Sequence, residues 1–163
     1  MSTTGTGTST STSTSHDIDI DSLTPEGMAR IPKDEFAYPG PVRDALTASI
    51  LAGRKTSTAC LHREFEILDE RIPKAGDLRM LIDSHGQDIA ILRYTSIESK
   101  RFIDVDDRHA IDEGEGYTDA AGWRKAHANF WNSTEYREEF GQDFTINDDT
   151  LVTLERFEVA RLL

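Results

Sequence analysis

Two apolar runs over residues 78–82 and 89–97 constrain the fold most strongly, because both are rich in residues that favour strands. The connection between them, Ser84-His85-Gly86-Gln87, is short, polar and contains a glycine. Two strand patterns joined in this way predict a β-hairpin with a slightly long loop. An antiparallel strand pair is therefore expected near the middle of the chain.

Helical and extended patterns alternate along the rest of the chain. Apolar residues recur every four positions over residues 41–52, which predicts a helix that Gly53 ends. Further helices are expected from Arg108 and from Thr118-Asp119, the second continuing over residues 132–143. Strands are expected over residues 57–67 and 151–163, the latter with a register change near Arg156, and a short strand or extended link over residues 101–105. This irregular interleaving favours a small α+β barrel over a doubly wound parallel sheet.

Composition divides the chain into three parts. Residues 1–16 are almost entirely Ser, Thr and Gly, so we expect a disordered tail that buries too little apolar surface to fold. Residues 17–35 are expected to form a poorly ordered lead-in with one turn at Pro25-Glu26-Gly27. Residues 36–163 are expected to form the folded domain.

The net charge of −12 argues against tight, sequence-independent binding of long RNA or DNA. Basic residues roughly match acidic ones between Arg43 and Arg101, so a local basic cleft for a small nucleotide-like ligand stays possible. We expect a cytoplasmic protein without a membrane span, because no apolar run approaches the roughly 18 residues needed and the first residues lack a signal-peptide pattern. The single cysteine, Cys60, is expected as a buried small hydrophobe; a thiol paired with His62 is the alternative.

The loop Gly53-Arg54-Lys55-Thr56-Ser57-Thr58 brings an amine and several hydroxyls onto one short segment. A lysine becomes a base or nucleophile when burial or a neighbouring positive charge lowers its pKa, and Arg54 or Arg93 could supply that charge. The competing interpretation is a solvated lysine that complements the dipole of the preceding helix. The hydroxyls of Thr56 and Thr58 are either reactive groups or ordinary strand-forming side chains.

His109 and Glu113 lie four residues apart and so share a helix face, just before the glycines of Glu113-Gly114-Glu115-Gly116 end the helix. Three interpretations stay open for this segment. It is a solvated acidic loop, a general acid or base at a cleft, or a metal site built from His109, Glu113, Glu115 and His127.

Three aromatic residues leave a similar choice open. Trp123 and His127 share one face of an expected helix, and Tyr94 lies in the middle of an expected strand. Each is either a core residue or part of a platform on which a base stacks.

Taken in order along residues 36–159, these segments resemble the longer, bacterial type of ASCH domain protein. The matching motifs are Gly53-x-Lys55-Thr56-x-Thr58, Pro73-x-x-Gly76-Asp77, Phe102-x-x-Val105, Ala110-x-x-Glu113-Gly114-Glu115-Gly116, Trp123-Arg124-x-x-His127 and Leu154-Glu155-Arg156-Phe157. Tyr117 departs from the pattern, because the family often has an aspartate there.

The resemblance implies a PUA-like mixed β-barrel surrounded by helices, with RNA or a modified nucleoside as partner and no cofactor or metal. It implies one of two hydrolytic activities, cleavage of single-stranded RNA or removal of the acyl group of N4-acetylcytidine; a non-catalytic binding module is the third possibility. It assigns catalytic roles to Lys55, Thr58 and Glu113. Substrate contacts are expected from Arg54, Thr56, Arg93, Tyr94, Trp123 and His127. The oligomeric state stays open.

Overall fold

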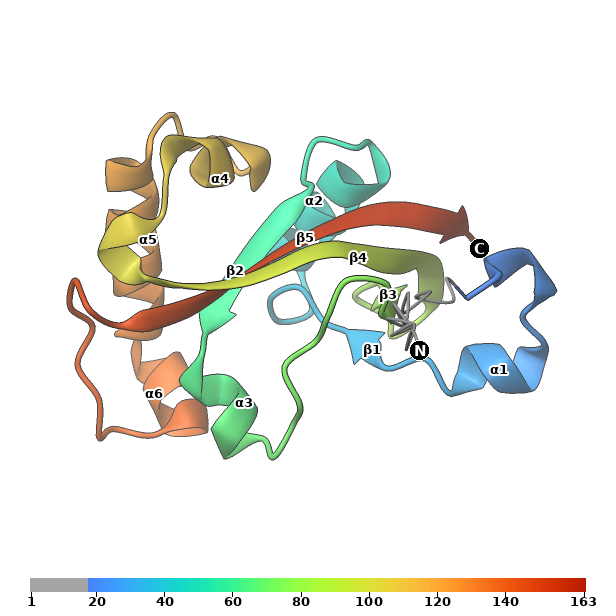
Figure 1. Ribbon diagram of the computed structural model, residues 1–163, viewed down its shortest axis with the longest axis horizontal. Coiled ribbons are helices and arrows are strands. Elements are labelled where there is room, and N and C mark those ends of the chain that lie inside the picture. Colours follow the sequence, from blue (N-terminus) through green and yellow to red (C-terminus); the bar gives the residue numbers. More distant parts are fainter. Residues whose placement is uncertain (1–17) are drawn as a thin grey trace, which may run out of the picture.

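The computed structural model describes residues 18–163, so the expected disorder of residues 1–16 lies outside the described part. Figure 1 shows a central sheet with α4, α5 and α6 at one end and α1 at the other. Residues 18–34, expected as a poorly ordered lead-in, carry three elements. These are η1 (Ile20–Ser22), α1 (Pro25–Ala29) and the two-residue strand β1 (Lys33–Asp34). The side chains of Asp19 and Thr24 cap η1 and α1, which explains why this polar segment takes defined turns.

Five strands form one mixed sheet in the order β1-β3-β4-β5-β2. The strands after β1 are β2 (Ser57–Leu61), β3 (Leu78–Ile82), β4 (Asp88–Arg101) and β5 (Leu151–Leu162). β1 and β3 are parallel, and the other neighbours are antiparallel. The predicted α+β class is confirmed. Among the described residues no hydrogen-bonded pairing joins the edge strands β1 and β2, so the sheet does not close into a barrel.

The predicted central hairpin is the β3–β4 pair, and β4 then continues along β5 for most of its length. β4 is longer than the run over residues 89–97 suggested. The predicted register change near Arg156 is also confirmed: Tyr94 pairs with Phe157, while Ser96 pairs with Arg156, so Thr95 is an extra residue in β4. A bulge of this kind increases the local twist of the two strands.

Two predicted strands were wrong in part. The segment over residues 57–67 leaves the sheet after Leu61, because His62 adopts helical φ and ψ and α3 (Arg63–Ile67) follows. The Glu64 carboxylate accepts a hydrogen bond from Leu61 N and thereby satisfies the backbone at this corner. The short strand or extended link expected over residues 101–105 is instead the end of β4 followed by a turn of 3-10 helix, η2 (Phe102–Asp104).

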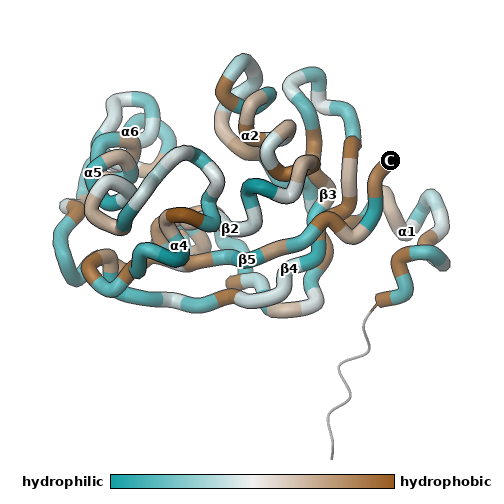
Figure 2. The backbone as a smooth tube through the Cα atoms, turned by 90° about the horizontal axis from the view of Figure 1, so that it is seen from above, coloured by the Kyte–Doolittle hydropathy of each residue, from teal (hydrophilic) through white to brown (hydrophobic). Residues whose placement is uncertain are grey.

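The longer helices pack on the sheet as amphipathic elements. α2 (Pro41–Leu51) covers a core around Ile50, Leu92 and Phe157, and α5 (Ala120–Trp131) contributes Trp123 and Trp131 to a second core. α4 (Asp107–Asp112) and α6 (Thr134–Phe140) also pack on this second core, through Ala110 and Tyr136. Figure 2 shows apolar colouring on α2 and around β3, and α1 at the edge of the molecule.

Candidate functional site

The turn after α4 lies directly against the loop that precedes β2. Thr56 N donates to the carbonyl of Asp112 at 2.9 Å, and Gly114 follows with φ +65°. A β-carbon on Gly114 would lie 2.5 Å from the carbonyl oxygen of Arg54, well inside contact distance. The glycine is therefore required both for its left-handed backbone and for this close approach.

Lys55 is buried at this junction rather than solvated. Its Nζ donates to the carbonyl oxygens of Ser57 at 3.0 Å and Glu113 at 3.3 Å, and to Oε1 of Glu115 at 2.7 Å. Three acceptors match the three hydrogens of an ammonium group, so this arrangement holds a charged lysine. A lysine used in this way ties the two loops together and offers no free lone pair to a substrate.

Glu113 is equally buried, with 1% of its side chain exposed, and its two oxygens face two imidazoles. Oε1 lies 2.9 Å from His109 Nε2, and Oε2 lies 3.3 Å from His127 Nε2. Burial by itself would raise the pKa of Glu113, but the hydrogen bonds from both histidines and the charge of Lys55 lower it to about 2. The carboxylate is thus an anchor that stays ionised at neutral pH.

His127 lies between two acceptors. Its Nδ1 is 3.0 Å from the carbonyl oxygen of Trp123, while Nε2 faces Glu113. A carbonyl and a carboxylate only accept hydrogen bonds, so both contacts form when both ring nitrogens carry hydrogen. The ring stacks on Trp123 with centroids 4.1 Å apart, and Trp123 is completely buried. Trp123 is therefore a core residue and offers no open face to a base.

Thr58 lies on the opposite side of β2 from this cluster. Ser57 Oγ donates to the carbonyl of His109, whereas Thr58 pairs directly with Glu155 of β5. Adjacent residues of a strand point to opposite faces. The structure therefore brings Lys55, Glu113 and His109 together and leaves Thr58 beside Glu155. The Thr58 side chain forms no hydrogen bond with any residue of 18–163.

The other predicted substrate contacts are dispersed. Arg54 is exposed, and Thr56 Oγ1 donates to the carbonyl of Asp112. Arg93 donates through Nη2 to the carbonyl of Ile18, and Tyr94 is buried with its hydroxyl 3.2 Å from Asp34 Oδ2. Arg54 and Thr56 thus flank Lys55 at the junction, whereas Arg93 and Tyr94 lie elsewhere, so the four do not converge on one site.

Glu155 belongs to a buried polar group on the Thr58 side of the sheet. Burial and the neighbouring carboxyl of Asp34 raise its pKa to about 7, while Tyr94 and Arg79 act in the opposite direction. The hydroxyl of Tyr94 has a single hydrogen, which it donates to Asp34, so it cannot serve both carboxyls at once. Glu155 is therefore suited to hold a proton near neutral pH.

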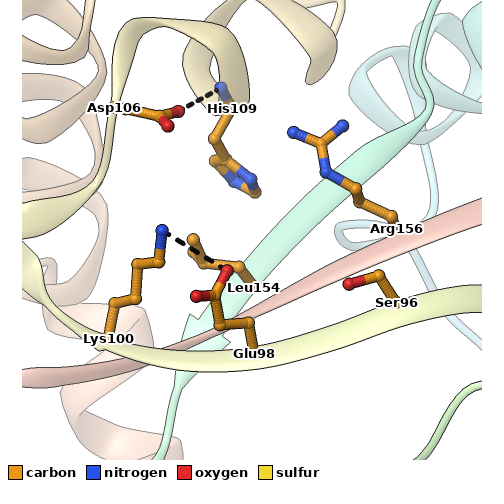
Figure 3. Close-up of a pocket in the computed structure, with 7 residues that line it drawn as sticks. All are labelled: Ser96, Glu98, Lys100, Asp106, His109, Leu154 and Arg156. Atoms are coloured by element: carbon orange, nitrogen blue, oxygen red, sulfur yellow. Dashed lines mark hydrogen bonds and ion pairs between the residues drawn. The ribbon is translucent and has the colours of Figure 1, made fainter.

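A cavity of about 60 Å³ lies on the face of β4 and β5 that α4 covers. Figure 3 shows the His109 ring, the Lys100 ammonium and the Arg156 guanidinium arranged around it, with Leu154 at its base. Lys100 pairs with Glu98 at 3.3 Å, and Arg156 pairs with Asp112 at 2.7 Å. The full lining is Ser96, Glu98, Lys100, Asp106, His109, Leu154 and Arg156.

His109 connects this cavity to the buried cluster. Its Nε2 is bound to Glu113, and Nδ1 has no hydrogen-bond partner within residues 18–163. An oriented imidazole beside two cations can hold an anionic group and exchange a proton with it. Sequence reasoning missed Lys100 and Arg156. The alternation of Ser96, Glu98 and Lys100 places them on one face of β4, but the partner strand and the helix above them were not predictable.

The metal interpretation of the His109–Glu113 segment finds no support in the geometry. Within the described residues, no group of three or more His, Cys, Asp or Glu side chains is arranged to hold a metal ion.

In the same part of the chain, no helix is both long and apolar enough to span a membrane.

Comparison with known proteins agrees with the motifs. A model of the ASCH domain matches residues 35–161. The crystal structure of an ASCH domain from Lactobacillus crispatus JV V101 is similar with a TM-score of 0.69 and 27% identity, covering 86% of this chain and 88% of that one. A protein from Enterococcus faecalis V583 is similar with a TM-score of 0.64 and 27% identity, covering 74% of this chain and 70% of that one. No curated protein shows a significant match.

Proposed function

Because the chain belongs to the ASCH domain family, which is generally linked to RNA binding, we propose that it binds single-stranded RNA and cleaves it beside His109. The observation that carries the proposal is the position of the His109 ring, held by Glu113 on one side and lining a cavity with Lys100 and Arg156 on the other. An oriented imidazole can take the proton of an attacking hydroxyl, and neighbouring cations can stabilise the phosphoryl charge, so together they can support phosphodiester cleavage.

The reaction follows from these positions. His109 takes the proton from a ribose 2′-hydroxyl as its oxygen attacks the adjacent phosphorus. The bond from phosphorus to the 5′-oxygen breaks, water protonates that oxygen, and the products are a 2′,3′-cyclic phosphate and a 5′-hydroxyl. Arg156 and Lys100 stabilise the charge that develops on the phosphoryl oxygens.

Glu113 and Lys55 act through His109 in this scheme. Glu113 fixes the orientation of the ring through Nε2, and its pKa of about 2 keeps it ionised during the reaction. Lys55 fixes the turn that carries Glu113, because its ammonium donates to the Glu113 carbonyl. Both are positioning residues here, although the family resemblance assigned them catalytic roles.

The size of the cavity limits what enters it. About 60 Å³ is too small for a nucleobase, so the bases lie outside, and only the phosphoryl group and the ribose edge that carries the 2′-hydroxyl reach His109. Glu98 and Asp112 partly offset the two cations, and the chain carries a net charge of −12. We therefore expect weak binding with few phosphate contacts and a shallow salt dependence.

A second candidate is removal of the acyl group of N4-acetylcytidine. It is favoured by one observation: Thr58 lies directly opposite Glu155, a carboxyl whose pKa of about 7 suits it to activate a hydroxyl. Lys55 would then act only in holding the loop before β2.

The test compares four proteins on a fluorescently labelled single-stranded RNA: wild type, His109→Gln, Arg156→Gln and Arg108→Gln. Arg108 is a matched control, because it also pairs with Asp112 but does not line the cavity. Cleavage that falls about 100-fold or more in His109→Gln, falls in Arg156→Gln and is unchanged in Arg108→Gln supports the proposal.

Parallel assays separate the alternatives. Release of cytidine from N4-acetylcytidine that depends on Thr58 and Glu155 would move the second candidate to first place. RNA binding by anisotropy without any product from either substrate would identify a non-catalytic binding module.

A further inference from the structure

A second, larger cavity lies between the N-terminal segment, residues 18–34, and the start of β3. Its volume is about 280 Å³, close to the lower end of the roughly 300–1,000 Å³ typical of small-molecule sites. It has room for a ligand much larger than a single phosphoryl group, and it shares no lining residue with the His109 cavity.

The walls of this cavity are of two kinds. One wall is aliphatic, formed by side chains of the N-terminal segment and β3: Ile18, Leu23, Ile31 and Leu78. Leu23 and Ile31 pack against the same apolar core as Leu78. An aliphatic wall of this kind favours an apolar body over a polar one.

The other wall is positively charged. Three arginines line the cavity, Arg30, Arg71 and Arg79, against a single carboxylate, Asp77. Asp77 is already paired with Arg71 at 2.7 Å, and Arg30 forms no ion pair within residues 18–163. The Arg79 guanidinium lies over the Tyr94 ring and interacts with Asp34 and Glu155, so Arg30 and Arg71 are the two guanidinium groups that set the charge of this wall.

We propose that this cavity binds a small organic anion, with an aliphatic body against Leu23 and Ile31 and a carboxylate or phosphate head between Arg30 and Arg71. Guanidinium groups match both head groups, because each presents two parallel N–H donors to two oxygens. None of the lining residues within 18–163 is aromatic, so an aliphatic ligand fits better than a nucleobase.

Binding would also stabilise the N-terminal segment. The end of the segment is fixed by the pairing of β1 with β3, while its start is held by the packing of Ile20 and by hydrogen bonds from Arg93 to the carbonyl of Ile18 and from Arg161 to the carbonyl of Ile20. A ligand that touches both the segment and β3 binds the folded state alone and therefore raises the apparent stability of that region.

The experiment uses the full chain and three probes: octanoate and octyl phosphate below their micelle concentrations, and neutral octanol below its solubility limit. Calorimetric titration should detect the two anions and no comparable binding of octanol. The stronger of the two anions identifies the head group. Hydrogen exchange of residues 18–34 should slow when the better anion is present.

Two variants and one control complete the test. Arg30→Gln with Arg71→Gln should weaken anion binding about tenfold or more, since charged hydrogen bonds are lost. Gly27→Leu should abolish anion binding, because Gly27 lines the cavity and the new side chain would occupy it. The helix should tolerate the change, since a β-carbon at Gly27 meets Leu23 and Thr24 only at 3.4 Å. Arg101→Gln removes an arginine elsewhere and should bind like wild type.

Equal binding of octanol and the anions, or anion binding unchanged in both cavity variants, would overturn the inference. RNA cleavage should not differ between wild type and Gly27→Leu, so failure of this proposal and failure of the RNA proposal are distinguishable.

Discussion

The ammonium of Lys55 lies 2.7 Å from the carboxylate of Glu115, and the same ammonium also holds the backbone carbonyls of Ser57 and Glu113. This lysine joins the loop before β2 to the turn after α4. It positions Glu113, which in turn positions His109 beside the cavity. The first two predictions test that chain of contacts.

Replacing Lys55 with Met should lower the free energy of unfolding by about 3 kcal/mol, because it leaves buried carbonyl groups without a donor. Urea denaturation followed by fluorescence of the two buried tryptophans measures the change. Thr58→Ala is the control, since its hydroxyl forms no hydrogen bond within residues 18–163. A loss below about 1 kcal/mol for Lys55→Met would contradict the structural role.

Gly114→Ala should be more damaging than Gly116→Ala. Both glycines have positive φ, so both substitutions introduce backbone strain of about 1–3 kcal/mol. At Gly114 the new methyl would also overlap the Arg54 carbonyl at 2.5 Å, whereas at Gly116 nothing lies within 4 Å. Denaturation curves for the two variants isolate the overlap, and equal losses would show that the loops are not in close contact.

Glu113 should stabilise the fold above its unfolded pKa and lose this effect in acid. Its pKa falls from 4.5 to about 2 on folding, so its contribution of about 3 kcal/mol is present above pH 4.5 and disappears as pH falls toward 2. Urea midpoints between pH 7 and pH 3 should therefore fall less steeply for Glu113→Gln than for wild type. Parallel curves for the two proteins would show that Glu113 is not the responsible carboxylate.

Glu155 should act in the opposite sense. Its pKa rises from 4.5 to about 7, so the folded state loses about 3 kcal/mol as pH rises between these values. Glu155→Gln should remove that loss and be more stable than wild type at pH 8, with the advantage shrinking at pH 5. The same alkaline loss in Glu155→Gln and wild type would show that ionisation of Glu155 does not cause it.

The sequence predicted the central hairpin, the long helix after Pro41 and the family because each depends on local pattern or ordered motifs. The family resemblance grouped Lys55 with Glu113, and the structure joins them through the Glu113 carbonyl. The turn after Leu61 was missed because the apolar pattern continues through α3, and a corner stabilised by Glu64 has no clear local signal.

The contents of the candidate site were harder to predict. Lys100 and Arg156 reach the same cavity only through the pairing of β4 with β5 and its shift at Thr95, which depends on long-range contacts. Thr58 was grouped with Lys55 by motif, but the alternation of side chains along β2 turns it toward Glu155. Strand register decides these positions, and the sequence alone does not reveal register.

The most direct measurement uses a DNA oligonucleotide that contains one ribonucleotide. We predict cleavage at that position alone, with a 2′,3′-cyclic phosphate detected by mass spectrometry and a rate at least about 100-fold lower in His109→Gln than in wild type. Cleavage of the all-DNA oligonucleotide, or equal rates for wild type and His109→Gln, would contradict the account.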